Sequence, residues 1–337
     1  MKKLSFLLVI TLLVAFTSKA QNSLIATLSH QGHVQMFYGP KALTKAHEAA
    51  TTGDVITLSS GTFEACNITK AVKIIGAGMA ATAQGGNSVL NGSFQIQVDD
   101  TDNICTLEGV WSNQTIYYYK ANLEIIKCAF FGSFVYSGAD YKEVRFIQSK
   151  IGNLSIGGGA TTAFYNCDVA FFTKYTTYDL TGLVEVTNCV VRTNSGDFQI
   201  NKLRPISLYN CIICSNYDSG SNCLTSSCNV LNCIAVGPGA QYMFRNIPNQ
   251  TNTVVNGGFE EVFKTYRGTW VESEMYELTD EAAATYLGSD GTQVGMYGGI
   301  LPFDPVPSNP QITKCNVASK SSLDGKLSVD IEVSVAK

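Results

Sequence analysis

The sequence predicts an all-β fold in which parallel coils of about 22 residues stack into a solenoid. Four short runs carry the prediction: 164–169, 186–191, 208–213 and 230–235, and each places an Asn-Cys pair between apolar residues. The pairs recur with a step of 22 residues, as Asn166, Asn188, Asn210 and Asn232 and as Cys167, Cys189, Cys211 and Cys233. A fixed period of this size marks a stacked architecture in which each unit is completed by its neighbours.

Apolar residues alternate on both sides of each Asn. In each run, the residue three positions before the Cys is apolar: Phe164, Val186, Leu208 and Val230. The residue two positions after the Cys is also apolar or small: Val169, Val191, Ile213 and Ala235. This period of two predicts two short strands with inward side chains. Asn suits the bend between them, because it tolerates the left-handed backbone region and its amide can hydrogen-bond along a stack.

Helical repeats do not fit this pattern. Val, Ile, Tyr, Phe and Thr dominate the coils, and ankyrin or tetratricopeptide repeats would need about 33–34 residues. The period and the alternation together predict a single-stranded right-handed parallel β-helix, with neighbouring strands about 4.8 Å apart.

The Asn-Cys units resemble the repeat of the pectate-lyase-like superfamily of right-handed β-helix proteins. The resemblance covers residues 164–235, and weaker coils precede it. Cys128 follows Lys127 where Asn is expected, Cys105 lies 23 residues earlier, and the strand-like run 144–149 fills the gap before Cys167. The resemblance implies the fold, but a fold does not determine an activity.

Residues 1–20 have the features of a signal peptide. Lys2 and Lys3 precede an apolar run over 4–16, and Ser18-Lys-Ala20 is a small-x-small cleavage site. The apolar run is short for a transmembrane helix, so we expect no membrane span after cleavage. The sequence thus predicts an exported protein, in the periplasm, on the outer cell surface or outside the cell, with residues 21–37 as an N-terminal linker.

Residues 38–304 are expected to form the β-helix with its N-terminal cap. The run 41–50 predicts a short amphipathic α-helix that covers the open end of the first coil. After residue 236 the period is lost, and 288–303 is rich in Gly and ends in Pro-Phe. This ending resembles a group of exported bacterial, mainly Bacteroidetes-type, proteins of undefined function.

Residues 305–337 are expected to hold a Pro-rich linker and a C-terminal β segment. Pro305 to Pro310 form the linker. Two strand-like pieces follow, at 311–317 and 327–335, with the turn Asp324-Gly325 between them. They predict a β-hairpin, packed on the solenoid or docking elsewhere.

Composition excludes some classes of partner. The chain has 337 residues, 45% of them hydrophobic, and a formal net charge of −4. A core of useful size is therefore expected, and a nucleic-acid partner is not, because nucleic-acid binding favours a basic surface.

The eleven cysteines are expected to be mainly structural. The four ladder cysteines lie in inward columns, where a thiol behaves as a small hydrophobe, so we expect them reduced. Cys223 and Cys228 could close a small loop. A zinc site from Cys211, Cys214, Cys223 and Cys228 is not expected, because Cys211 belongs to an inward column and no His lies nearby.

Two sets of residues are candidates for ligand binding. Tyr117, Tyr119, Tyr175 and Tyr178 lie in aromatic runs that cannot bury all their rings, and sugars stack on such faces, although a Tyr-rich outer wall is ordinary on a solenoid. Asp99, Asp100 and Asp102 form an oxygen-rich cluster that could hold calcium, and a solvated turn is the alternative. No other cofactor is expected.

The sequence leaves two classes of function open, a non-catalytic binding or structural protein and a carbohydrate-active enzyme. The only histidines are His30, His33 and His47, all before the first coil, and the coils contain no pair of aspartates. Arg192 near Asp168 or Asp197 is the one candidate cluster, and we expect an ordinary surface ion pair there. We therefore expect no catalytic residues and a non-catalytic protein that binds glycans or other cell-surface components, or is structural at the cell envelope. A polysaccharide lyase or glycoside hydrolase acting on an acidic or neutral polysaccharide is the alternative.

Overall fold

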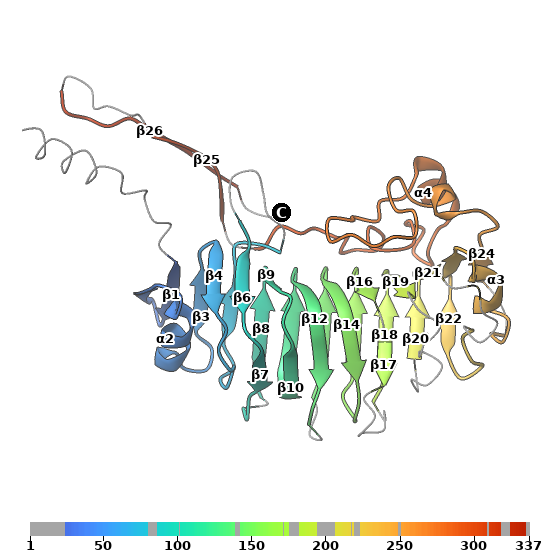
Figure 1. Ribbon diagram of the computed structural model, residues 1–337, viewed down its shortest axis with the longest axis horizontal. Helices are drawn as coiled ribbons and strands as arrows, with labels where there is room; N and C mark the ends of the chain where they lie inside the picture. The colour runs from blue at the N-terminus through green and yellow to red at the C-terminus, as the bar shows by residue number, and fades with distance from the viewer. Residues whose placement is uncertain are drawn as a thin grey trace, which may run out of the picture.

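The protein is a parallel β-solenoid (Figure 1). The computed structural model describes residues 24–79, 86–100, 102–138, 142–170, 172–174, 182–193, 206–216, 218, 223–248, 251–308, 310–317 and 324–334. The predicted signal peptide lies outside these ranges, as do Tyr175, Tyr178 and Asp197. The parallel coils of about 22 residues confirm the predicted fold class.

Two long sheets run the length of the solenoid. Sheet A contains, in spatial order, β2 (His33–Tyr38), β1 (Ile25–His30), β3 (Val55–Leu58), β5 (Lys73–Ile75), β8 (Ile104–Glu108), β11 (Asn122–Ile126), β13 (Val144–Ile147), β15 (Thr162–Tyr165), β18 (Val184–Thr187), β20 (Ile206–Tyr209) and β22 (Asn229–Leu231). Sheet B contains β4 (Gly61–Glu64), β6 (Ser88–Asn91), β9 (Val110–Ser112), β12 (Ala129–Tyr136), β14 (Lys150–Ile156), β16 (Asp168–Ala170), β19 (Val190–Thr193), β21 (Ile212–Ser215), β23 (Ile234–Val236) and β24 (Thr253–Val254). Three further strands, β7 (Phe94–Gln97), β10 (Ile116–Lys120) and β17 (Phe172–Lys174), pair alongside sheet B.

The bend between the two sheets has the predicted left-handed backbone. The φ angles of Asn166, Asn188, Asn210 and Asn232 lie between 51° and 55°. Lys127 (φ 51°) and Gln148 (φ 48°) occupy the same bend in earlier coils. These six residues form one column, here called the bend column, and the two non-Asn members show that the weaker coils belong to the same repeat.

The predicted cysteine ladder lies inside the solenoid. Cys167, Cys189, Cys211 and Cys233 are fully buried and are free thiols. The backbone N–H of Cys167 donates to Cys189 Sγ at 3.3 Å, and that of Cys211 donates to Cys233 Sγ at 3.4 Å. Burial also raises the pKa of the Cys105 and Cys128 thiols to about 12. The column is therefore apolar packing, with the thiols as its small members.

The N-terminal end differs in one respect from the prediction. Helix α2 (Ala42–Ala49) covers the first coil as expected. However, the linker expected over 21–37 contains strands β1 and β2, which form an antiparallel hairpin and extend sheet A. Ala26 and Leu28 alternate inward from β1 and are buried, which is why this segment is a strand.

The chain after the last coil turns back along the solenoid. Helix α3 (Ala240–Met243) lies before β24, and the returning chain includes the 3-10 helix η2 (Phe259–Glu261) and α4 (Asp280–Thr285). Figure 1 shows the orange and red chain lying along one side of the strands. We call residues 255–287 the covering segment and residues 288–308 the strap.

The strap follows the bend column one coil at a time, back toward the N-terminal end. Asn210 Oδ1 accepts from Ser289 N at 3.0 Å, and Asn166 Nδ2 donates to the carbonyls of Met296 and Gly298 at 2.8 and 2.7 Å. Further along, the Gln148 amide donates to the carbonyl of Leu301 at 3.4 Å. Lys127 Nζ lies 3.0 Å from Asp304 Oδ2, and Ser308 N donates to the Glu108 carboxylate.

These contacts correct the expected role of the Asn amides. The amides of Asn166 and Asn210 bond to the backbone of the strap. The residues 305–308, expected to belong to a linker, are likewise bonded to the solenoid through Val306 and Ser308.

Replacement of Asn166 tests this description of the strap. We expect Asn166→Gly to lower the free energy of unfolding by about 1–3 kcal/mol, because the buried carbonyls of Met296 and Gly298 lose their donor. Asn166→Ala should cost about 1 kcal/mol more, because Ala is strained at this positive φ. Urea denaturation measures both. Asn232→Gly is the control, since Asn232 lies in the bend column beyond the strap. Equal losses at positions 166 and 232 would contradict the description.

A second test of the strap is its response to acid. Burial alone would raise the pKa of Glu108, but Lys73, 2.8 Å away, and Ser308 hold it below its usual value. A carboxyl whose pKa is lower in the folded state stabilises the fold above the unfolded pKa of about 4.3, and this contribution is lost as the pH falls through the folded pKa.

We therefore expect Glu108→Gln to lower stability at neutral pH and to have a smaller effect in acid. Urea midpoints of wild type and variant, measured at about pH 7 and about pH 3, check the prediction. A gap between the two proteins that stays constant or widens in acid would contradict it.

The C-terminal pieces form the predicted hairpin. Strands β25 (Gln311–Val317) and β26 (Val329–Ser334) pair antiparallel, and Figure 1 shows them projecting away from the solenoid. No helix in the described part of the chain has the length and apolarity to cross a bilayer.

Candidate functional site

One column of outward-facing side chains runs along sheet B. Backbone pairing places in it, in spatial order, Thr62, Val89, Trp111, Ala129, Lys150, Asp168, Val190, Ile212, Ile234 and Thr253. We call it the outer column. Its two halves have different surroundings: the half from Lys150 to Ile234 is covered by the chain itself, and the half from Thr62 to Ala129 borders an open groove.

The covered half forms a second hydrophobic core outside the solenoid. Val190, Ile212 and Ile234 are buried against apolar side chains of the covering segment and the strap. The largest of these are Phe259, Phe263, Tyr266, Tyr276, Met296 and Phe303. The outer face of sheet B is therefore interior over these coils.

A charged cluster is buried in this second core. Arg192 Nε lies 2.6 Å from Asp168 Oδ1 and Arg192 Nη2 lies 3.2 Å from Oδ2, and the two side chains are only 2% and 0% exposed. The guanidinium carbon lies 5.3 Å from the centroid of the Trp270 ring and 5.8 Å from that of Tyr276. The expectation of a surface ion pair is thus wrong, because the covering segment excludes water from it.

Lys150 anchors the edge of the covering segment. Its Nζ donates to the carbonyls of Glu272 and Glu274 at 3.0 and 2.7 Å and lies 3.7 Å from Met275 Sδ. Burial lowers the pKa of Lys150, and the charges of Asp168 and Glu274 oppose that shift. For Arg192, burial alone would lower the pKa, but Asp168 raises it. The cluster is buried and its charges are paired, so its chemistry is structural.

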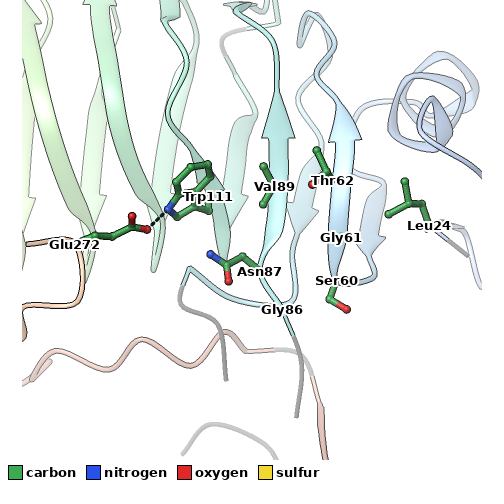
Figure 2. Close-up of a pocket in the computed structure, with 9 residues that line it drawn as sticks. All are labelled: Leu24, Ser60, Gly61, Thr62, Gly86, Asn87, Val89, Trp111 and Glu272. Carbon is green, nitrogen blue, oxygen red and sulfur yellow. Dashed lines mark hydrogen bonds between the residues drawn. The ribbon is translucent and has the colours of Figure 1, made fainter. Parts of the chain in front are cut away.

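The open half of the outer column is the floor of a groove. Two adjoining hollows of about 510 and 460 Å³ share Asn87 and Glu272 in their linings. The first is also lined by Leu24, Ser60, Gly61, Thr62, Gly86, Val89 and Trp111, and the second by Met79, Ala129, Phe131, Lys150, Ser273, Met275 and Pro305. Figure 2 shows the first hollow, with Trp111 and Glu272 at one end and Leu24 at the other.

Aromatic rings concentrate at the junction of the two hollows. Trp111 is half-buried, and its ring centroid lies 6.3 Å from that of Phe131 in an edge-to-face arrangement. Phe131 in turn lies 5.1 Å from Trp270, at the edge of the covering segment. Trp111 Nε1 donates to the Glu272 carboxylate (Figure 2). This bond fixes the indole while part of its surface faces the groove.

The predicted tyrosines lie elsewhere. Tyr117 and Tyr119 are on β10, with Tyr117 exposed and Tyr119 half-buried, and neither lines the groove. Tyr118 between them is buried and donates to the carbonyl of Ala121 at 2.7 Å. Tyr175 and Tyr178 lie outside the described residues, so their part of the hypothesis stays a prediction.

The predicted calcium ligands lie in an exposed turn with local contacts. Asp100 accepts from Asp102 N and Asn103 Nδ2, and Asp99 lies 3.6 Å from Lys120 Nζ. Among the described residues, no group of three or more His, Cys, Asp or Glu side chains is arranged to hold a metal ion. Calcium binding by Asp99, Asp100 and Asp102 stays a prediction.

The cysteines considered as zinc ligands do not converge. Cys211 points into the solenoid, whereas Cys214 lies in the second core on the opposite face of sheet B. Cys223 and Cys228, considered as a loop-closing pair, are both free thiols.

One His–Asp pair lies near the N-terminal cap. His30 Nδ1 lies 2.7 Å from Asp54 Oδ1 and 3.3 Å from Thr51 Oγ1. Both contacts use the same ring nitrogen, so the imidazole does not relay a proton between the carboxylate and the hydroxyl as a nucleophilic triad requires. The cluster holds the loop between α2 and β3.

The functional candidates missed from the sequence are Trp111 and Glu272. They are 161 residues apart, and only the return of the covering segment brings them together. A signal was available for Trp111, because it alternates with the buried residues Val110 and Ser112 and so faces outward from sheet B. No comparable signal marks Glu272.

A scan against protein-family models finds no matching model, and searches of the curated proteins and of the solved structures find no match.

Proposed function

We propose that the protein is an exported, non-catalytic glycan-binding protein and that a glycan chain lies in the groove beside Trp111. The observation that carries the proposal is the half-buried indole on the groove floor, fixed by its bond to Glu272 and surrounded by neutral polar groups. The predicted signal peptide supports a role outside the cytoplasm.

The chemistry of the groove fits a sugar. A pyranose has apolar C–H faces and a rim of hydroxyl groups. An aromatic ring can pack against such a face, as Trp does wherever one side of it is apolar and the other wet. Ser60, Thr62 and Asn87 supply donors and acceptors for hydroxyls, and Glu272 supplies acceptors.

Binding is better supported than cleavage. Glycoside hydrolysis generally requires two carboxyl groups about 5–9.5 Å apart. Glu272 is the only carboxylate among the described residues that line the two hollows. Lys150, the one side chain in the lining that could act as a base for a lyase, directs its amino group at protein acceptors. The buried Arg192–Asp168 pair is out of reach of a polymer.

The test is incubation of the mature protein with a panel of plant, host and bacterial polysaccharides, with and without calcium. We expect retention on at least one polymer in affinity electrophoresis, with no new reducing ends and no unsaturated uronate. Tyr117→Ala should be retained like wild type, because Tyr117 lies outside the groove. Product formation would favour the lyase or hydrolase alternative, and absence of retention on every polymer would overturn the proposal.

A further inference from the structure

The groove presents few charged side chains. Among the described residues, its lining contains two ionisable side chains, Glu272 and Lys150. The remaining lining residues that the structure describes are neutral. The charge that a ligand meets therefore depends on which of these two groups has bonding capacity left.

Lys150 has no hydrogen-bond donor left for a ligand. An ammonium has three donors, and Lys150 directs Nζ at the carbonyls of Glu272 and Glu274 and at Met275 Sδ. The residue is 6% exposed. A carboxylate on a ligand could bind this ammonium only by displacing the edge of the covering segment.

Glu272 has capacity left. It is exposed and lines both hollows, and the bond from Trp111 Nε1 uses Oε1. An ionised carboxylate is an acceptor only, with room for about four hydrogen bonds. Its remaining positions favour ligand O–H or N–H groups and repel a ligand carboxylate or sulfate.

We propose that the groove selects neutral or amino sugars and rejects chains that carry uronate or sulfate groups. The inference rests on the proposed glycan-binding function and adds the ligand class. It differs from what fold analogy with pectate-lyase-like proteins suggests, because it depends on the one charge that this groove presents.

The test uses one polymer in two forms. The neutral polymer that best retains the protein is compared with the same polymer after its primary alcohols have been oxidised to carboxylates. We expect wild type to bind the oxidised form at least about fivefold more weakly at low salt, and the difference to shrink at about 1 M salt, where charges are screened. The side-chain oxygen of Glu272→Gln can still accept from Trp111. This variant should raise the ratio of the affinity for the oxidised polymer to the affinity for the neutral polymer about fivefold.

Glu281→Gln is the matched control. It removes one exposed carboxylate on α4, outside the groove lining, and should leave the ratio unchanged. Stronger wild-type retention on acidic than on neutral polymers would overturn the inference and leave glycan binding intact. A ratio that Glu272→Gln and Glu281→Gln shift equally would also overturn it. Failure to bind any polymer would overturn the proposed function itself.

Discussion

Replacement of Asp168 by Ala is expected to lower the free energy of unfolding by about 3–5 kcal/mol, the range measured when one partner of a buried ion pair is removed. The loss is large because Arg192 then remains charged at 2% exposure, beneath Trp270 and Tyr276. Chemical denaturation of the purified variant measures the effect.

The control for Asp168 is a double replacement. Asp168→Leu combined with Arg192→Met removes both charges and keeps much of the volume, and such exchanges are often neutral or stabilising. We expect the double variant to be much closer to wild type than Asp168→Ala. If Asp168→Ala lowers the free energy of unfolding by less than about 1 kcal/mol, water reaches the pair and the covering segment does not pack as described.

Replacement of Trp111 by Ala is expected to weaken glycan binding by at least about 30-fold, the effect of losing a contact worth about 2 kcal/mol. Trp111 supplies the apolar surface at the junction of the two hollows and holds Glu272 in place. Affinity electrophoresis with the retained polymer measures the change, and circular dichroism checks that the variant is folded.

Trp111→Phe separates the two contributions of the indole. Phe keeps an aromatic face but cannot donate to Glu272, so an intermediate loss of affinity is expected. Wild-type affinity in Trp111→Ala would place the glycan elsewhere. The exposed tyrosines would then be the next candidates for the glycan-binding site, beginning with Tyr117 on β10.

The repeat made most of the fold predictable from the sequence. Each coil is a local pattern: an inward Cys, a left-handed residue before it and apolar residues on alternate positions. Stacked coils must share one backbone geometry, and for this reason even Lys127 and Gln148 take the same backbone conformation as the Asn residues. The cap helix and the C-terminal hairpin also follow from local alternation and turn residues.

The strap and the covering segment were harder to foresee because their contacts are long-range. The Asn166 amide bonds to residues 130 and 132 positions later, and no local pattern encodes that pairing. A clue does exist in the outer column. Val190, Ile212 and Ile234 each follow a ladder Cys and therefore face outward, and three apolar residues in register on an outer face indicate that something covers it.

The candidate site depends on where that cover ends. The outer column is covered from Lys150 to Ile234 and borders the groove from Ala129 back to Thr62, and the boundary is Glu272 to Met275. The groove is thus the uncovered part of a face that the chain otherwise hides. Sequence reasoning directed the search for sugar-binding aromatics to tyrosine runs, whereas the ring at this boundary is Trp111.

The most direct test of glycan binding at Trp111 is a fluorescence titration. The chain has two tryptophans, Trp111 on the groove floor and Trp270 at the edge of the covering segment. In a Trp270→Phe variant all tryptophan emission comes from Trp111. We expect a saturable change in its intensity or wavelength as oligosaccharides of the retained neutral polymer are added, with a midpoint that matches the affinity from electrophoresis. Retention of the polymer with no change in Trp111 emission would contradict the account.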